Sequence, residues 1–317
     1  MPSFVGSQLH FDRPLANFAT EYSNHELIGL TLCPEVMVEK KSDKFFKRAK
    51  ENSVRYQNPK IGHLQVPPEI EQAVSTDSFV CEDYGFLGKL ALDSEANADP
   101  PLALRQDVAA DLASRLRLAQ EVRIATLLTT SGSYDSGNVQ TLTGSDRWDS
   151  SGGGDPLAVI DTARASVWPG PRTKLVAFCG IDVWLKLKRH PAILDLIKGG
   201  ATTTDAAVVS KQKFAELIEV DEFVVGEARQ IATNPGQTSA STRVWGKYFG
   251  IVRVSMGQPS TRTLHFASSF AFGGLNMQTW IEQAPGLMGA YMQKLTHSTD
   301  EKVCVNDAGA LIVSPIS

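Results

Sequence analysis

The sequence lacks any apolar run long enough to cross a membrane, which takes about 20 consecutive residues, so we expect no membrane partner. Its four cysteines, Cys33, Cys81, Cys179 and Cys304, form no CxxC pair, which argues against a zinc or dithiol redox site. We expect them to be reduced and mostly buried. Basic residues are not in excess: 31 Lys and Arg face 35 Asp and Glu, a net charge of -4. This balance argues against a protein that binds nucleic acid along one strongly basic face.

Motifs that carry catalysis are also missing. The chain has no GxxxxGK[ST] phosphate loop, no GxGxxG dinucleotide fingerprint, no GxSxG elbow and no HExxH zinc motif. Its six histidines are scattered without metal-ligand spacing. We therefore expect a protein that is not an enzyme and that binds neither cofactor nor metal.

Three short features resemble sites, but each has a simpler interpretation. Residues 152–155, GGGD, precede a predicted helix and could bind an anion, although a turn with an N-terminal cap explains them better. His190 before Pro191 could be a general base, but it fits a break between two helices. Glu82 and Asp83 are adjacent, so in a strand they point to opposite faces and cannot act as a catalytic pair.

The first third of the chain is notable for weak periodicity and for charge. Residues 1–35 show no sustained pattern, which favours an arm lying on another surface. Between 40 and 60 the chain is basic, with Lys40, Lys41, Lys44, Lys47, Arg48, Lys50, Arg55 and Lys60. The following stretch is acidic, with Glu69, Glu71, Asp77, Glu82, Asp83, Asp93, Glu95, Asp99 and Asp107.

Residues 102–129 contain the clearest helical pattern. Leu104, Val108, Leu112 and Leu116 recur every four residues, and the apolar stripe continues at 119, 124 and 127. A helix of this length spans about 40 Å at 1.5 Å per residue, which is long for a chain of this size. Such a helix is suited to be a spine.

The remainder mixes helices and strands. We predict a helix over 156–168, a buried strand over 174–179, a helix starting at a capping Asp182 and a break at 190–191. Helix, strand and strand then follow at 213–218, 223–228 and 245–254, and short strand-like runs dominate from 264 onward. The fold class is therefore α+β.

Taken together, these segments resemble the major capsid proteins of tailed phages with the Hong Kong phage capsid fold, in particular the Mu-like and siphophage branch. The resemblance covers residues 100–254 well and the rest only in layout. It is carried by QEVRIATLLTTSGSY (120–134), VQTLTGSDRWD (139–149), DPLAVIDTARASV (155–167), KLVAFCGIDVWLKLKRHPAILDLIKG (174–199), FAELIEVDEFVVGEA (214–228) and VWGKYFGIVRV (244–254). The stretch from Val183 to Lys198 is the most specific piece.

The resemblance implies five segments. They are an N-terminal arm (1–35), an extended β-hairpin loop (36–78), a peripheral domain with the spine helix (79–155), an axial domain (156–254) and strands returning to both domains (255–317).

It also implies function and partners: self-assembly of pentamers and hexamers into the icosahedral head shell of the virion, formed in the host bacterial cytoplasm around double-stranded DNA. The expected partners are further copies, a portal, optionally a decoration protein, and packaged DNA through non-specific contacts. Some family members carry a removable scaffolding segment before the arm. Here the arm begins at once, so a separate scaffolding protein is expected. No residue pair identifies a covalent cross-link.

An arm and a loop with few internal contacts need neighbours to offset their ordering entropy. We hypothesise that the basic stretch rests on a neighbour's acidic stretch, with apolar residues such as Phe45 buried beside the charges. The expected contact residues are Lys40, Lys44, Phe45, Phe46, Lys47, Arg48, Lys50, Arg55, Glu69, Glu71, Asp77, Glu82 and Asp83.

Two other functions stay open. An encapsulin-type nanocompartment shell would share the fold and enclose a cargo enzyme, and neighbouring terminase, portal and tail genes would separate the two. An α+β enzyme with an unrecognised site would instead be a compact monomer that forms no large particles.

Overall fold

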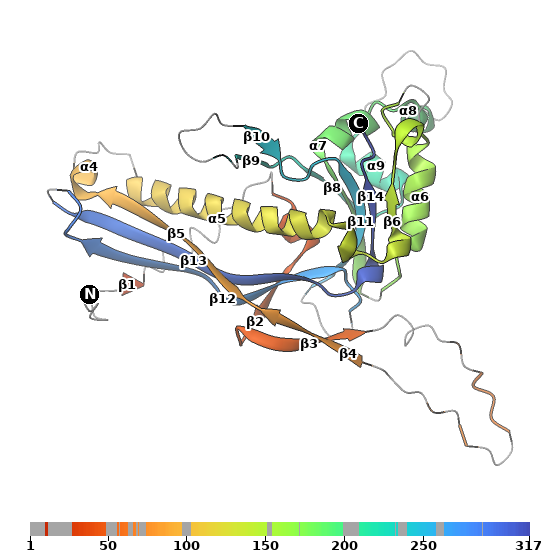
Figure 1. The fold of residues 1–317 in the computed structure, drawn as a ribbon, viewed down its shortest axis with the longest axis horizontal. Helices are drawn as coiled ribbons and strands as arrows, with labels where there is room; N and C mark the ends of the chain where they lie inside the picture. Colours follow the sequence, from red (N-terminus) through yellow and green to blue (C-terminus); the bar gives the residue numbers. More distant parts are fainter. Residues whose placement is uncertain are drawn as a thin grey trace.

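A computed structural model describes residues 10–11, 27–48, 56, 58–62, 66–67, 69, 74–96, 103–150, 154–170, 172–198, 209–231, 233, 240–257, 263–286 and 288–317. A long, narrow sheet with one long helix lies beside a second sheet covered by short helices, and a hairpin projects from their junction (Figure 1). Among the described residues, no helix combines the length and apolar character needed to span a membrane.

We call the second sheet the axial sheet. Its strands, in spatial order, are β6 (Val139–Thr141), β14 (Gly309–Val313), β11 (Tyr248–Ser255), β7 (Thr173–Gly180) and β8 (Glu222–Gly226). One face packs against α6 (Pro156–Ser166), α7 (Ile181–Leu187), α8 (Pro191–Lys198) and α9 (Lys211–Leu217). The other face packs against the short α2 (Gly29–Leu32) and the end of the long helix α5 (Leu104–Thr129). Because both faces are covered, β7, β8 and β14 each contain a continuous apolar run.

The helices of the axial sheet begin and end close to the predicted points. Asp155 caps α6 by accepting hydrogen bonds from the backbone N–H groups of Leu157 and Ala158, at 3.0 and 3.4 Å, which confirms the predicted cap. The break before Pro191 is also confirmed, since α7 ends at Leu187 and α8 begins at Pro191. The predicted cap at Asp182 is wrong. Gly180 is the N-cap and Asp182 lies in the first turn, where the helix dipole stabilises a negative charge.

We call the long sheet the peripheral sheet. It comprises β1 (His10–Phe11), β12 (Ala267–Glu282), β13 (Ala290–Val303) and β5 (Glu82–Ala91) in that order, with β2 (Glu35–Val38) parallel to β12. The C-terminal runs predicted as short strands are therefore wrong in length, because β12 has 16 residues and β13 has 14. Their register shifts between Phe272 and Asn276, where Gly273 and Gly274 take φ values of +70° and +67°.

Helix α5 matches the predicted spine helix of 102–129 in position, and it lies along the peripheral sheet (Figure 1). Its buried stripe starts with Ala109, Leu112, Ala113 and Leu116, which pack on the peripheral sheet, and ends with Ile124, Ala125 and Leu128, which pack on the axial sheet. Between these two apolar ends the stripe is polar, since Gln120 and Glu121 are buried there.

Strands β3 (Ser42–Arg48) and β4 (Val74–Val80) form a separate two-stranded sheet, which we call the hairpin. Three short elements, α4 (Leu92–Ala96), β9 (Arg229–Ile231) and β10 (Ser241–Arg243), and four single 3₁₀ turns, Ser131–Ser133, Ser136–Asn138, Gly144–Asp146 and Asn306–Ala308, complete the described chain.

Two boundaries of the sequence-based division need correction. Residues 28–33, assigned to the arm, include Ile28, Leu32 and Cys33 in the core between α5 and the axial sheet. Strand β6, assigned to the peripheral domain, pairs with β14 in the axial sheet. Neither placement has a local sequence signal, because each depends on a partner more than 90 residues away.

Candidate functional site

The structure brings most of the predicted contact residues into one strip along the hairpin and the start of β5. The strip contains Lys40, Lys44, Phe45, Phe46, Lys47, Arg48, Asp77, Glu82 and Asp83. Glu69 is described but lies in no helix or strand, and Lys50, Arg55 and Glu71 lie outside the described residues. The strip is the candidate assembly surface.

Part of its charge is already paired within the chain. Lys47 lies 2.7 Å from Asp77, Lys41 lies 2.6 Å from Asp83, and Lys40 lies 3.3 Å from Asp43. Hydrogen bonds from the lysines lower the pKa of Asp77 and of Asp83 below the usual range. Exposed pairs of this kind contribute about 0–1 kcal/mol each. Contacts between copies would therefore have to share these charges or use the remaining ones, such as Lys44.

An aromatic cluster anchors the hairpin to the peripheral sheet. The Phe79 ring stacks on Phe270 with centroids 4.6 Å apart, and Phe45 packs on the same ring at 5.2 Å. Cys81 and Cys304 fill the rest of this cluster, and all four cysteines are free and buried, as predicted. Phe45, expected at a contact between copies, thus packs against its own chain. These aromatic contacts hold the hairpin against the peripheral sheet, and strand β3 also carries charged residues.

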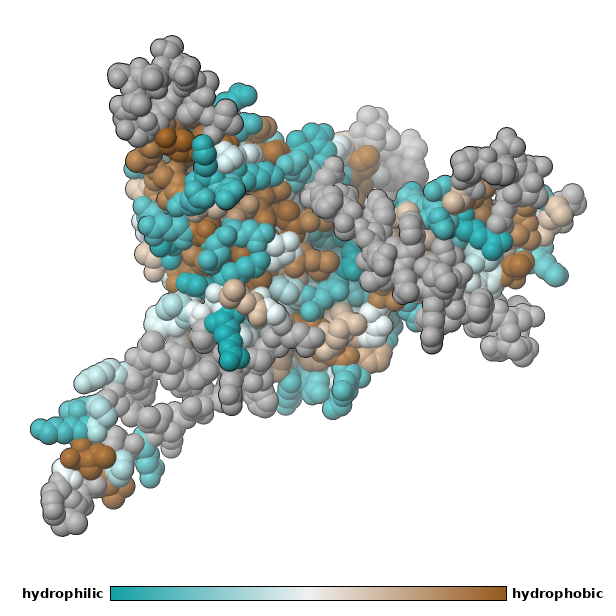
Figure 2. Space-filling model, turned by 180° about the vertical axis from the view of Figure 1, so that it is seen from behind, coloured by the Kyte–Doolittle hydropathy of each residue, from teal (hydrophilic) through white to brown (hydrophobic). Residues whose placement is uncertain are grey.

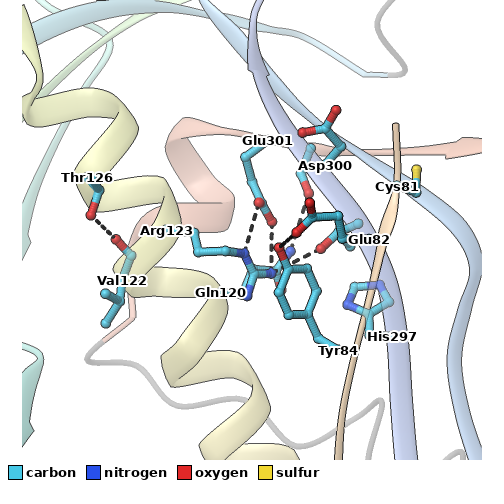
Figure 3. Close-up of polar contacts among 12 residues, drawn as sticks. Cys81, Glu82, Tyr84, Gln120, Val122, Arg123, Thr126, His297, Asp300 and Glu301 are labelled. Atoms are coloured by element: carbon cyan, nitrogen blue, oxygen red, sulfur yellow. Dashed lines mark hydrogen bonds and ion pairs between the residues drawn. The ribbon is translucent and has the colours of Figure 1, made fainter. Parts of the chain in front are cut away.

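Beneath the middle of α5 lies a group of polar side chains that we call the polar belt (Figure 3). The Arg123 guanidinium donates to both carboxylate oxygens of Glu301, at 3.0 and 3.1 Å, and to the Thr299 hydroxyl at 3.0 Å. It also lies 3.7 Å from the ring centroid of Tyr84, on the neighbouring strand. One side chain of α5 therefore ties the helix to both β13 and β5.

The belt continues toward β2. Arg117 and Gln120 both donate to Glu35, at 2.7 and 3.1 Å, and His297 lies 3.8 Å from the same carboxylate. Burial opposes ionisation of Glu35, but the charge of Arg117 and the hydrogen bonds from Gln120 and Arg117 outweigh it and lower the pKa of Glu35. Burial lowers the pKa of His297, which is only 4% exposed. The arrangement couples the helix to strands from both ends of the chain.

Glu121 joins three parts of the molecule that are distant in sequence. Its carboxylate accepts hydrogen bonds from the backbone N–H groups of Ile28 and Gly29, at 2.9 and 2.7 Å, and from the Trp245 indole at 2.7 Å. Burial raises the pKa of Glu121. A Cβ atom at position 29 would collide with this carboxylate, so a glycine is needed there. Sequence reasoning missed this residue, although a Gln-Glu pair inside an apolar stripe was an available signal.

Among the described residues, a polar cavity and two adjacent carboxylates were further candidates for a site. A polar cavity of about 480 Å³ lies between α6 and the axial sheet, lined by Asp161, Arg164, Ala165, Leu175, Glu219, Asp221 and Arg253. Three carboxylates and two guanidinium groups line it, and Arg164 pairs with Glu219. No cluster of three or more His, Cys, Asp or Glu side chains in the described part of the chain could hold a metal. Glu82 accepts a hydrogen bond from the Tyr84 hydroxyl, and Asp83 accepts one from the Lys41 ammonium group.

Comparison with known proteins gives a consistent picture. No protein-family profile matches the chain. It is 26% identical over 301 residues to the major capsid protein of Pseudomonas phage JBD67, a match covering 94% of each chain. It is 23% identical over 265 residues to the major capsid protein of Burkholderia phage BcepMu, with 82% of each chain covered.

Solved structures agree on the fold. A phage-related protein from Bordetella bronchiseptica superposes with a TM-score of 0.76 at 20% identity, over 97% of this chain and 98% of that one. The capsid of cyanophage P-SCSP1u gives 0.57 at 10% identity, over 99% and 92%. The SrpI encapsulin of Synechococcus elongatus gives 0.53 at 9% identity, over 91% and 88%. The chain thus has the Hong Kong phage-type capsid fold that its sequence predicts, and its sequence relatives are major capsid proteins of Mu-like phages.

Proposed function

We propose that this chain is the major capsid protein of a tailed phage, a structural subunit that assembles into the head shell around double-stranded DNA. The observation that carries the proposal is the similarity to a phage major capsid protein over 94% of both chains. A hairpin that projects from the junction of the two sheets fits a subunit that is completed by its neighbours (Figure 1).

Several finer statements belong to the same proposal. The shell would form from pentamers and hexamers in the host cytoplasm, with the axial sheets meeting at the five- and six-fold positions. A separate scaffolding protein and a portal would take part, and a decoration protein is an optional addition. Contact with DNA would be non-specific and weak, in keeping with a net charge of -4. The chain would have no catalytic role.

Electron microscopy of the purified protein tests the proposal directly. We expect closed shells, or capsomers that close into shells when a scaffolding protein encoded beside the chain is co-expressed. A compact monomer under both conditions, at concentrations where related shells form, would contradict it.

The encapsulin-type shell is the second candidate, supported by the similarity in fold to an encapsulin. Purified particles separate the two functions by their contents. A phage capsid expressed with its packaging genes encloses nuclease-protected DNA, whereas a nanocompartment encloses a cargo protein. The sequence relatives favour the phage capsid.

A further inference from the structure

The polar cavity beside α6 contains an arginine that continues a row of core residues. Along β11, Phe249 and Ile251 are fully buried in the apolar core under the helices. Val252 and Val254 pack on the opposite face of the sheet. Alternate residues of a strand share a face, so Arg253 lies on the helix side, next in line after Ile251. A guanidinium group therefore stands where the row of buried side chains would continue, and it lines the cavity.

Two donors on this face of β11 have no acceptor among the described residues. The Nε atom of Arg253 is buried and has no hydrogen-bond partner, and Arg253 forms no ion pair with a described residue. Two residues further along the strand, Ser255 is only 5% exposed, and its buried hydroxyl has no partner there either. Burial lowers the pKa of Arg253, and the charge of Asp221 offsets this only in part. Buried donors without an acceptor are rare and costly, so these two need an explanation.

The other charged groups of the cavity are of two kinds. Arg164 is paired with Glu219, so the chain itself neutralises both of these charges. Asp221 accepts a hydrogen bond from a backbone N–H of β7 at 2.6 Å, and Asp161, on α6, forms no ion pair with a described residue. The lining therefore offers one cation without a bound carboxylate, Arg253, and two carboxylates without a bound cation, Asp161 and Asp221.

This pattern of charges favours a ligand that carries both signs. A carboxylate matches the planar fork of the Arg253 guanidinium. An ammonium group on the same ligand would complement Asp161 and Asp221. An anion alone would meet three carboxylates and only one guanidinium that is not already paired, so it fits less well. The volume of about 480 Å³ lies within the range of small-ligand pockets, about 300–1,000 Å³.

We propose that this cavity binds a small zwitterion of the amino-acid class, with its carboxylate on Arg253 and its ammonium group toward Asp161 and Asp221. The inference goes beyond the shell function and does not depend on it, because all the lining residues belong to one chain. It gives the buried guanidinium the acceptor that the described residues do not supply.

Three small molecules of similar size test the charge pattern. Alanine carries both charges, propionate carries only the carboxylate, and ethylammonium carries only the cation. Saturation-transfer NMR on the purified chain follows the methyl protons of each molecule at constant ionic strength. We expect alanine to bind at least about tenfold more tightly than either of the other two, because each of them lacks one charge-assisted contact. No binding of alanine, or equal binding of all three, would overturn the proposal.

A variant of the arginine separates a ligand site from a structural role. Arg253→Met should weaken alanine binding by about tenfold or more. Without ligand it should be at least as stable to denaturant as the unmodified chain, because it removes a buried donor that lacks an acceptor. Arg115→Met, on the exposed side of α5, is the matched control and should bind alanine normally. Unchanged binding by Arg253→Met, or a clear loss of its stability without ligand, would overturn the proposal.

A second variant gives a test that does not depend on how Arg253→Met folds. Asp161 is exposed on α6, so Asp161→Asn should fold normally. It should weaken the binding of alanine, whose ammonium group loses a partner, and leave the binding of propionate unchanged. An equal effect on both molecules, or no effect on alanine, would contradict the proposed orientation of the ligand and overturn the assignment.

Discussion

The axial sheet and the hairpin differ in what holds each of them. Both faces of the axial sheet are covered, and side chains such as Phe178, Phe249 and Ile251 are fully buried within the chain. The hairpin packs at its root through Phe45 and Phe79, and its remaining described contacts are largely exposed ion pairs. Figure 2 shows one face of the molecule, on which brown apolar and teal polar residues both lie over the compact part.

The axial sheet is therefore stabilised by side chains buried within the chain, whereas the hairpin has few buried contacts of its own. Burial of an apolar side chain contributes about 1.5–3 kcal/mol, while an exposed ion pair contributes about 0–1 kcal/mol. Substitutions in the axial sheet should therefore affect folding of the unassembled chain. Substitutions on the hairpin should affect assembly and leave folding almost unchanged.

The largest effect is expected in the axial sheet. Phe249→Ala removes a fully buried ring that packs edge-on against Trp148, and should lower the free energy of unfolding by about 4 kcal/mol. Denaturant titration followed by tryptophan fluorescence measures the loss. A loss below about 1 kcal/mol would contradict this expectation, because it would mean that the axial sheet depends on neighbouring subunits.

Glu121→Ala comes next. It leaves three buried donors, on Ile28, Gly29 and Trp245, without their acceptor, and should lower the free energy of unfolding by about 3 kcal/mol. The Glu121→Gln variant adds a second test, in which stability is measured as a function of pH.

The pKa of Glu121 is raised in the native state, so the native chain binds the carboxyl proton of Glu121 more tightly than the unfolded chain does. The stability of the native chain relative to Glu121→Gln should be greatest below the ordinary carboxyl pKa. It should fall as the pH rises through the native value. A difference that stays constant with pH would contradict this assignment.

Arg123→Ala should have an intermediate effect. It leaves Glu301 buried beneath α5 without its cation and removes the contact with Tyr84, so we expect a loss of about 2 kcal/mol. Hydrogen exchange should show faster opening of β5 and the middle of α5, with the axial sheet unaffected. Arg115→Ala is the matched control, because its pair with Asp111 is exposed and should matter little.

The smallest effect on folding is expected in the hairpin. Lys47→Ala removes the pair with Asp77 and should cost less than about 1 kcal/mol in the unassembled chain. Because Lys47 lowers the pKa of Asp77, this contribution is present above the ordinary carboxyl pKa and is lost as the pH falls through the native value. Particle yield, in contrast, should fall clearly, since the loss is repeated at every subunit. Unchanged yield would argue against a role of this surface in assembly.

Elements with a local signal can be predicted from the sequence. Apolar residues spaced four apart predict α5, the cap at Asp155 starts α6, and Pro191 separates α7 from α8. Helical and strand periods are properties of neighbouring residues, so they can be read without knowing the fold. The resemblance in residues 100–254 extended this reading to the capsid fold.

Contacts between distant segments, in contrast, appear only in the folded structure. It placed β6 beside β14, joined Glu121 to Gly29 and Trp245, and paired Lys47 with Asp77 instead of leaving both charges free for a neighbour. Strands β12 and β13 are also longer than the sequence predicts. Polar residues such as Gln293 and Thr299 are buried within the sheet, so the sequence lacks the expected alternation of apolar and polar residues. Such contacts carry no local period. They depend on closing loops of tens to hundreds of residues, and only the whole fold fixes that geometry.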